Sequence, residues 1–149
     1  MKLKNETLSK NFLIYGFGKS GISSLKYLKK KNRCFIFDDD KKKIKNKYKK
    51  FFISKSKLLN NNFDYIVISP GININRCQLS NYLKKNQKKV ITDFDIFYKF
   101  NPEILTITIT GTNGKSTTSK LLYDILKNHN YDARLTGNIG NPILDEKRI

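Results

Sequence analysis

Short apolar runs alternate with longer, lysine-rich amphipathic stretches along the chain. This alternation is typical of βα units built on a parallel sheet. Apolar runs predict strands at residues 12–15, 34–37, 65–68 and 90–91. Apolar residues at helical spacing predict helices after three of these strands, at residues 22–28, 79–83 and 93–100, and the charge run at 41–50 predicts a surface helix.

A second unit is expected after Asn101-Pro102, so the predicted domains are residues 1–101 and 102–149. The later residues predict a strand at 105–110, a glycine loop, a helix through Leu121 to Leu126, and a strand at 133–136. One strand–loop–helix–strand unit cannot cover both faces of a parallel sheet. The fold class expected is therefore α/β, with a parallel-sheet N-terminal domain followed by the start of another α/β domain.

The first glycine loop, Gly16-Phe17-Gly18-Lys19-Ser20-Gly21, is a complete GxGxxG between a predicted strand and a predicted helix. Glycines there let the backbone turn tightly and approach phosphates, which bind the free N–H groups of a helix N-terminus. Asp38 ends the second predicted strand, where such folds place a carboxylate that reads a ribose or base. A tight turn without a ligand is the alternative interpretation.

The second glycine loop is Thr110-Gly111-Thr112-Asn113-Gly114-Lys115-Ser116-Thr117. Its Gly-Lys-Ser matches the end of a P-loop, in which the backbone surrounds phosphates, the lysine reaches the terminal ones and the hydroxyl ligates Mg²⁺. The loop is shorter than GxxxxGK[ST], because Ile109 stands where that pattern has its first glycine. An ATP site of the P-loop type is expected.

Composition changes this picture little. The net charge is +18, but 26 of the 30 basic residues are lysine, and Asn, Ile, Phe and Tyr are also abundant. These residues have AT-rich codons, so we attribute most of the basicity to codon bias on solvated faces, with nucleic-acid binding as the alternative. Cys34 and Cys77 are expected to be reduced thiols. The chain has no apolar run of about 18 residues and no apolar leader, which predicts a cytoplasmic protein without membrane insertion.

Four segments together resemble the Mur ligases of peptidoglycan synthesis, and among them the member that adds D-glutamate. They are the first glycine loop, Ser69-Pro70-Gly71-Ile72, the ATP-type loop at 109–118, and Gly137-Asn138-Ile139-Gly140. The resemblance extends over the whole chain and implies the N-terminal third of a ligase. Thr92 and Thr136 stand where the family usually has glycine.

The resemblance implies a Rossmann-like domain that holds the UDP part of a sugar nucleotide, and a P-loop ATPase-type domain after it. By position, the implied UDP-sugar contacts are Gly18, Lys19, Ser20, Asp38, Asp39, Gly71 and Asn138. The implied ATP contacts are Gly111, Thr112, Asn113, Gly114, Lys115, Ser116 and Thr117, with Lys115 catalytic and Ser116 on Mg²⁺.

The implied substrates are UDP-N-acetylmuramoyl-L-alanine, ATP and D-glutamate. The carboxylate of the sugar nucleotide would be phosphorylated to an acyl phosphate, which the amine of D-glutamate attacks. The family's D-glutamate domain and its other metal ligands would follow residue 149, so these residues alone are expected to be inactive, and the whole enzyme to be a monomer. His129, the one histidine, is expected at the surface.

Three alternatives stay open. An NAD- or nucleotide-binding module would explain the first loop and Asp38 but not the second loop. A basic nucleic-acid-binding protein predicts a steep dependence of affinity on salt. A folate-type or other amide ligase of the same superfamily would share the ATP loop, but it does not explain the four segments in this order.

Overall fold

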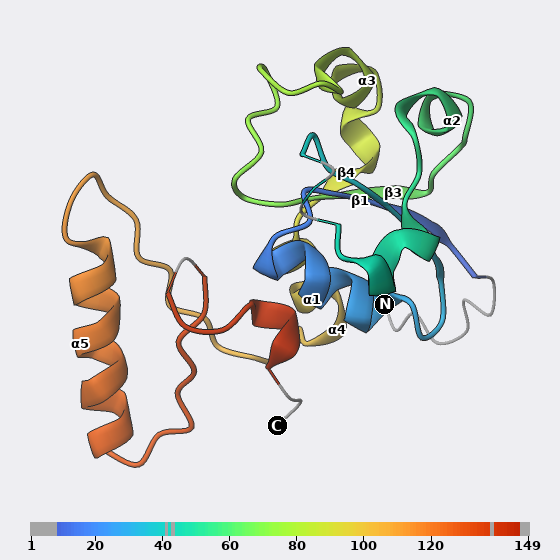
Figure 1. Ribbon diagram of the computed structural model, residues 1–149. Coiled ribbons are helices and arrows are strands. Elements are labelled where there is room, and N and C mark those ends of the chain that lie inside the picture. The colour runs from blue at the N-terminus through green and yellow to red at the C-terminus, as the bar shows by residue number, and fades with distance from the viewer. Residues whose placement is uncertain (1–8, 41, 43, 138, 147–149) are drawn as a thin grey trace.

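The computed structural model describes residues 9–40, 42, 44–137 and 139–146 (Figure 1). Four parallel strands form one sheet, in the order β2-β1-β3-β4. Their bounds are β1 Asn11–Tyr15, β2 Arg33–Phe37, β3 Tyr65–Ile68 and β4 Val90–Ile91. The four strands predicted within residues 1–101 and their parallel pairing are therefore confirmed.

Helices cover both faces of this sheet (Figure 1). On one face, α1 (Lys19–Leu28) and α4 (Asp93–Phe100) pack around Ile14 and Val67. On the other, α2 (Lys55–Leu59) and α3 (Ser80–Lys85) contribute to a second core around Leu13 and Ile66. Central strands that are buried on both faces carry apolar residues at consecutive positions, which explains the uninterrupted apolar runs.

Local sequence explains where the helices begin. The α4 helix starts at a capping box, in which the Thr92 hydroxyl accepts from the Asp95 N–H and the Asp95 carboxylate accepts from the Thr92 N–H. Thr92 therefore suits its position as the N-cap of α4. Ser54 caps α2, a helix that the apolar pattern does not reveal. The surface helix predicted in the charge run at 41–50 is a 3₁₀ helix over Asn46–Phe51 (η2), and Gln87–Lys89 form a 3₁₀ turn (η3) before β4.

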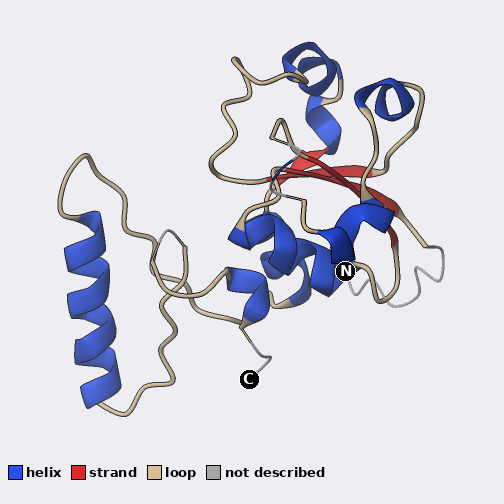
Figure 2. Cartoon of the chain, in the orientation of Figure 1, coloured by secondary structure: helices blue, strands red, loops and turns tan. Residues whose placement is uncertain are grey.

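The second region forms its predicted helix but not its predicted strands (Figure 2). The α5 helix spans Lys115–Asn128. Residues 105–110 are not a strand, and Leu105 is 97% exposed. Residues 133–136 are also irregular, apart from one bridge between Thr136 and Asn141. A strand needs a neighbouring strand to pair its backbone groups, and among the described residues none lies beside 105–110. The start of a P-loop-type sheet is thus not seen.

A short segment near the described C-terminus returns to the first region. The 3₁₀ helix η4 (Ile143–Asp145) packs against α1 and α4, and Ile143 and Leu144 are buried in the core there. The Ser23 hydroxyl on α1 donates to the Asp145 carboxylate at 2.8 Å. Residues beyond the expected boundary at 101 therefore complete one core of the N-terminal sheet.

Candidate functional site

The carboxyl ends of β1, β2 and β3 meet at one edge, and the first glycine loop lies on it. The Gly16 N–H donates to the Phe37 carbonyl at 3.0 Å, and the Ser69 N–H donates to the Tyr15 carbonyl at 2.9 Å. The Ser69 hydroxyl donates to the Gly16 carbonyl at 2.7 Å. The GxGxxG loop and the Ser69-Pro70-Gly71 segment are thus joined directly. In open parallel sheets this edge is where ligands bind.

The three glycines of the first loop serve different purposes. Gly16 has φ +89°, and a Cβ there would lie 2.8 Å from the Ser69 Cβ. A Cβ on Gly21 would lie 2.1 Å from the Gly16 carbonyl oxygen, so both positions are closed to side chains by the fold itself. Gly18 has an ordinary φ of −81° and nothing within 4 Å of its Cβ position. The fold does not require glycine there, so the open space above Gly18 is available to a ligand.

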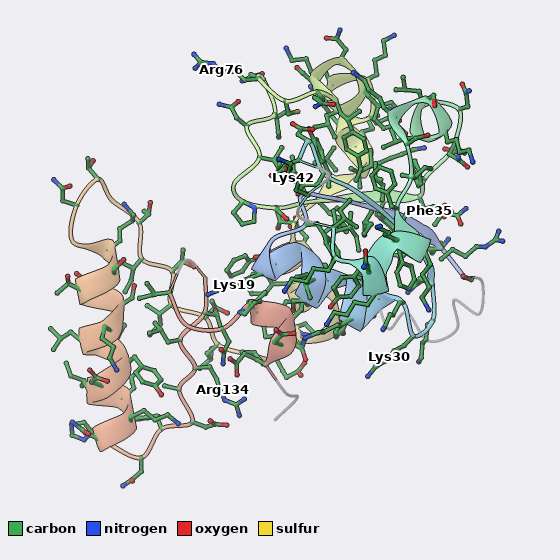
Figure 3. All side chains as sticks on the ribbon, viewed as in Figure 1. Lys19, Lys30, Phe35, Lys42, Arg76 and Arg134 are labelled. Atoms are coloured by element: carbon green, nitrogen blue, oxygen red, sulfur yellow. The ribbon has the colours of Figure 1, made fainter. Side chains whose placement is uncertain are left out.

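The start of α1 fits an anion. Gly18 is the N-cap, no side chain caps the helix, and its first turn holds no acidic residue. The first N–H groups of such a helix attract negative charge. Lys19 is exposed and extends toward the C-terminal segment (Figure 3), while Ser20 is half-buried. Their predicted place beside a diphosphate agrees with this geometry and stays a prediction.

The two predicted aspartates differ sharply in environment. Asp38 is only 4% exposed, and its carboxylate accepts from the Phe17 N–H at 2.6 Å and from the Asp40 N–H at 2.8 Å. Asp38 therefore holds the glycine loop against the end of β2. Asp39 is exposed, and its carboxylate accepts from the Tyr15 hydroxyl at 2.7 Å. The sequence did not reveal the Phe17 partner of Asp38 or the Tyr15 partner of Asp39, because these contacts depend on the strand order, whereas the Asp40 contact is local.

The second glycine loop opens α5 but is held mainly by its own atoms. Gly114 caps the helix in the left-handed conformation with φ +74°. The Lys115 ammonium donates to the Gly111 carbonyl and, at 3.3 Å, to the Thr112 carbonyl. No side chain caps α5, and its first turn has no acidic residue. Ser116 and Thr117 are exposed in that turn. The loop offers free helix N–H groups, a lysine and a hydroxyl, which together suit a polyphosphate.

Residues of both loops border one cavity of about 730 Å³. Ser20 comes from the first loop, and Lys115 and Ser116 come from the second. Gly71 is exposed with nothing within 4 Å of its Cβ position. Gly137 and Ile139 also line the cavity, whereas Asn138 lies outside the described residues. The cavity thus brings Ser20 of the first loop together with Lys115 and Ser116 of the second, whereas Gly18 and Lys19 do not line it.

Metal-ligand chemistry in this part of the molecule is sparse. Within residues 9–40, 42, 44–137 and 139–146, no group of three or more His, Cys, Asp or Glu side chains could hold a metal ion. His129 is exposed, as predicted, and Cys34 and Cys77 are free thiols.

No helix in the described part of the chain is both long enough and apolar enough to cross a membrane.

Comparisons with known proteins agree with the sequence motifs. Residues 10–92 match the family model for the N-terminal domain of MurD-like Mur ligases. The chain is 34% identical over 141 residues to UDP-N-acetylmuramoylalanine–D-glutamate ligase of Rickettsia bellii, covering 92% of this chain and 31% of that protein. It is 32% identical to the ligase of the same name from Clostridioides difficile, covering 91% of this chain and 32% of the relative.

The ligase of that name from Wolbachia pipientis is 32% identical, over 97% of this chain and 30% of its own length. The chain thus spans about a third of the length of the curated relatives that it matches. The family model covers more than half of the chain, including the whole parallel sheet. This chain belongs to the Mur ligase family, with a MurD-like N-terminal domain.

Proposed function

We propose that this chain provides the sugar-nucleotide loop and the ATP loop of a cytoplasmic ligase that adds D-glutamate to UDP-N-acetylmuramoyl-L-alanine. The observation that carries the proposal is the first glycine loop. It lies at the carboxyl edge of three parallel strands with open space above Gly18, in a chain whose relatives are named as D-glutamate ligases.

The first loop binds the UDP part of the substrate. The start of α1, with Lys19 and Ser20, receives the diphosphate, because its N–H groups and lysine favour negative charge. Asp38 and Asp39 lie on the uracil side, where an acceptor suits the N–H of a base or a ribose hydroxyl. Gly71 lets the backbone approach the sugar nucleotide, and Asn138 contacts it from the second region.

The second loop, residues 111–117, binds ATP. The free N–H groups at the start of α5 and the Lys115 ammonium neutralise the phosphates, and Ser116 holds Mg²⁺. When bound, Mg²⁺ supplies electrostatic stabilisation of the transferred phosphoryl group. Lys115 leaves the Gly111 and Thr112 carbonyls to do so, and this change needs only rotation about its side-chain bonds. The carboxylate of the sugar nucleotide accepts the terminal phosphoryl group of ATP, and ADP leaves. The amine of D-glutamate then attacks the acyl phosphate to form the amide, and inorganic phosphate leaves.

Calorimetric titration of the 149-residue chain tests the nucleotide assignment. The ligands are UDP, UDP-N-acetylmuramoyl-L-alanine and NAD, each at low and at physiological salt, because a net charge of +18 attracts any anion at low salt. Inorganic pyrophosphate serves as the charge control. We expect both uridine ligands to bind more tightly than pyrophosphate at physiological salt. Tight binding of NAD with no binding of the uridine ligands would overturn the proposal.

Substitution of Lys115 tests the ATP assignment. Lys115→Ala should weaken Mg–ATP binding by about tenfold or more, since a hydrogen bond to a charged group is worth roughly 1.5–3 kcal/mol. Lys120→Ala is the matched control, because Lys120 lies on the same helix and pairs with Asp124 on the exposed surface. UDP affinity should be the same in both variants. Equal losses of ATP affinity in the two variants would show only a change of net charge.

A further inference from the structure

The side chain of Tyr15 is fully buried, yet its hydroxyl makes a hydrogen bond to an exposed carboxylate. It is the last residue of β1, 0% exposed, and its ring packs edge-on against Phe37 at 5.5 Å between ring centres. Its hydroxyl donates to Asp39 Oδ1 at 2.7 Å, just beyond the end of β2. Asp39 is exposed, so one end of this hydrogen bond is anchored in the core and the other faces solvent.

The second oxygen of Asp39 reaches the segment that follows β3. The Gln78 N–H donates to Asp39 Oδ2 at 3.4 Å, and Cys77 lies close enough to Tyr15 to affect its ionisation. The adjacent Leu79 is 1% exposed and anchors the segment in the second core. Residues 15, 39 and 78 therefore connect the carboxyl ends of β1 and β2 with the segment between β3 and α3, at the proposed nucleotide edge.

The hydroxyl of Tyr15 acts as a donor throughout the ordinary pH range. Burial above all, and then the neighbouring Cys77 and Asp39, raise the pKa of Tyr15. The phenol therefore keeps its proton, and the acceptor in this pair is the carboxylate. Since a carboxylate has about four lone-pair sites, Asp39 can accept the Tyr15 and Gln78 hydrogens and still accept a ligand donor.

We propose that Tyr15 is a positioning residue for the sugar nucleotide, which holds the Asp39 carboxylate in place as an acceptor for the nucleoside end of the ligand. This inference rests on the proposed function. An exposed aspartate ordinarily samples several rotamers, and fixing it in advance removes an entropic cost of binding. The ligand group at Asp39 must be a donor, such as a ribose hydroxyl or the uracil N3–H, because two adjacent carboxylates repel phosphate.

A double-substitution cycle on UDP affinity tests the proposal in the 149-residue chain. Tyr15→Phe keeps the buried ring and removes the hydroxyl, and we expect UDP to bind about 3- to 10-fold more weakly. Asp39→Ala should weaken UDP at least as much. In the Asp39→Ala background, Tyr15→Phe should have no further effect on affinity, because the hydroxyl acts through that carboxylate.

Tyr82→Phe is the matched control, since Tyr82 is a partly buried tyrosine that packs against the same core. It should leave UDP affinity unchanged. Hydrogen exchange gives a second readout: Tyr15→Phe should speed exchange of the Gln78 amide and leave the amides of α5 unchanged.

The outcomes separate the two claims. If the wild-type chain does not bind UDP, the proposed function fails and the positioning role fails with it. If the wild type binds UDP and Tyr15→Phe binds it equally well, only the positioning role is overturned. Additive losses from Tyr15→Phe and Asp39→Ala would likewise overturn it, because a purely structural effect of the hydroxyl does not depend on Asp39.

Discussion

The two glycine loops have similar local sequences but very different surroundings. In the loop at 16–21, the Gly16 N–H donates to the end of β2, and the Gly16 carbonyl accepts from the Ser69 hydroxyl just after β3. The Phe17 N–H of the same loop donates to the Asp38 carboxylate. The loop at 111–117 is held mainly by the Lys115 ammonium, which donates to the Gly111 and Thr112 carbonyls of the same loop. The helices that follow differ in the same way: α1 buries Leu25 completely, and α5 has no buried residue.

This difference shows which features depend on local hydrogen bonds and which depend on partners far along the chain. Both helices form, because every helical hydrogen bond joins residues four apart. Only the first loop is preceded by a strand, because β1 has parallel partners on both sides, and residues 105–110 have none among the described residues. The first loop is therefore held by contacts with residues far along the chain, whereas the Lys115 contacts of the second loop are made within the loop itself.

Truncation of one leucine in each helix gives the largest expected contrast. Leu25→Ala in α1 should lower the free energy of unfolding by about 2–5 kcal/mol, since Leu25 is 0% exposed. Leu121→Ala in α5 should change it by about 0.5 kcal/mol or less, since Leu121 is 61% exposed. Urea unfolding followed by circular dichroism measures both. Comparable losses of unfolding free energy in the two variants would mean that Leu121 is buried in solution, and the contrast between α1 and α5 would then be wrong.

A methyl group added within the first loop should have the next largest effect. Gly21→Ala places a Cβ 2.1 Å from the Gly16 carbonyl oxygen and should cost about 1–3 kcal/mol of unfolding free energy. Gly18→Ala meets no atom within 4 Å and should keep stability within about 0.5 kcal/mol. Its UDP affinity should fall, because the methyl group occupies the space proposed for the diphosphate. Unchanged UDP affinity in Gly18→Ala would place the phosphates elsewhere.

Alkaline pH should weaken the first region through Cys34. Burial raises the pKa of the Cys34 thiol to about 11, against 9.0 for a free thiol. Well below pH 9 the Cys34 thiol keeps its proton in both the folded and the unfolded chain, so the free energy of unfolding does not change with pH through this group. Above pH 9 the unfolded chain ionises first, and stability should fall by about 1 kcal/mol by pH 10.

Cys34→Ala isolates this effect. Its stability should be lower at neutral pH, because a buried side chain is truncated, but it should fall less steeply from pH 8 to pH 10 than that of the wild type. Urea unfolding at each pH measures the slope. Parallel slopes for the two proteins would show that another group causes the decline. In the second region the shifted groups Lys120, Asp132 and Arg134 are all exposed and paired, so we expect α5 to depend on pH less steeply than the first region in this range.

Some features of this protein follow from the sequence alone. Apolar runs located all four strands, and helical spacing located α1, α4 and α5, because these patterns report burial and local backbone bonding. The GxGxxG pattern located the first loop at a strand–helix junction, because glycine tolerates conformations and contacts that other residues do not. The family followed from four motifs in order, and the family match confirmed it.

Tertiary structure decided what these residues contact. Sequence placed Asp38 at the end of a strand, but only the parallel pairing of β1 and β2 brings its carboxylate to the Phe17 amide. Likewise, the Tyr15 hydroxyl at the end of β1 donates to Asp39 just after the neighbouring β2. Ile143, more than a hundred residues after α1 in the sequence, packs in the same core as Leu25 and Leu28 of that helix. The predicted strand at 105–110 failed for the same reason. Strand pairing, side-chain contacts and core closure join residues far apart in sequence, and a local pattern carries no information about which distant partner is present.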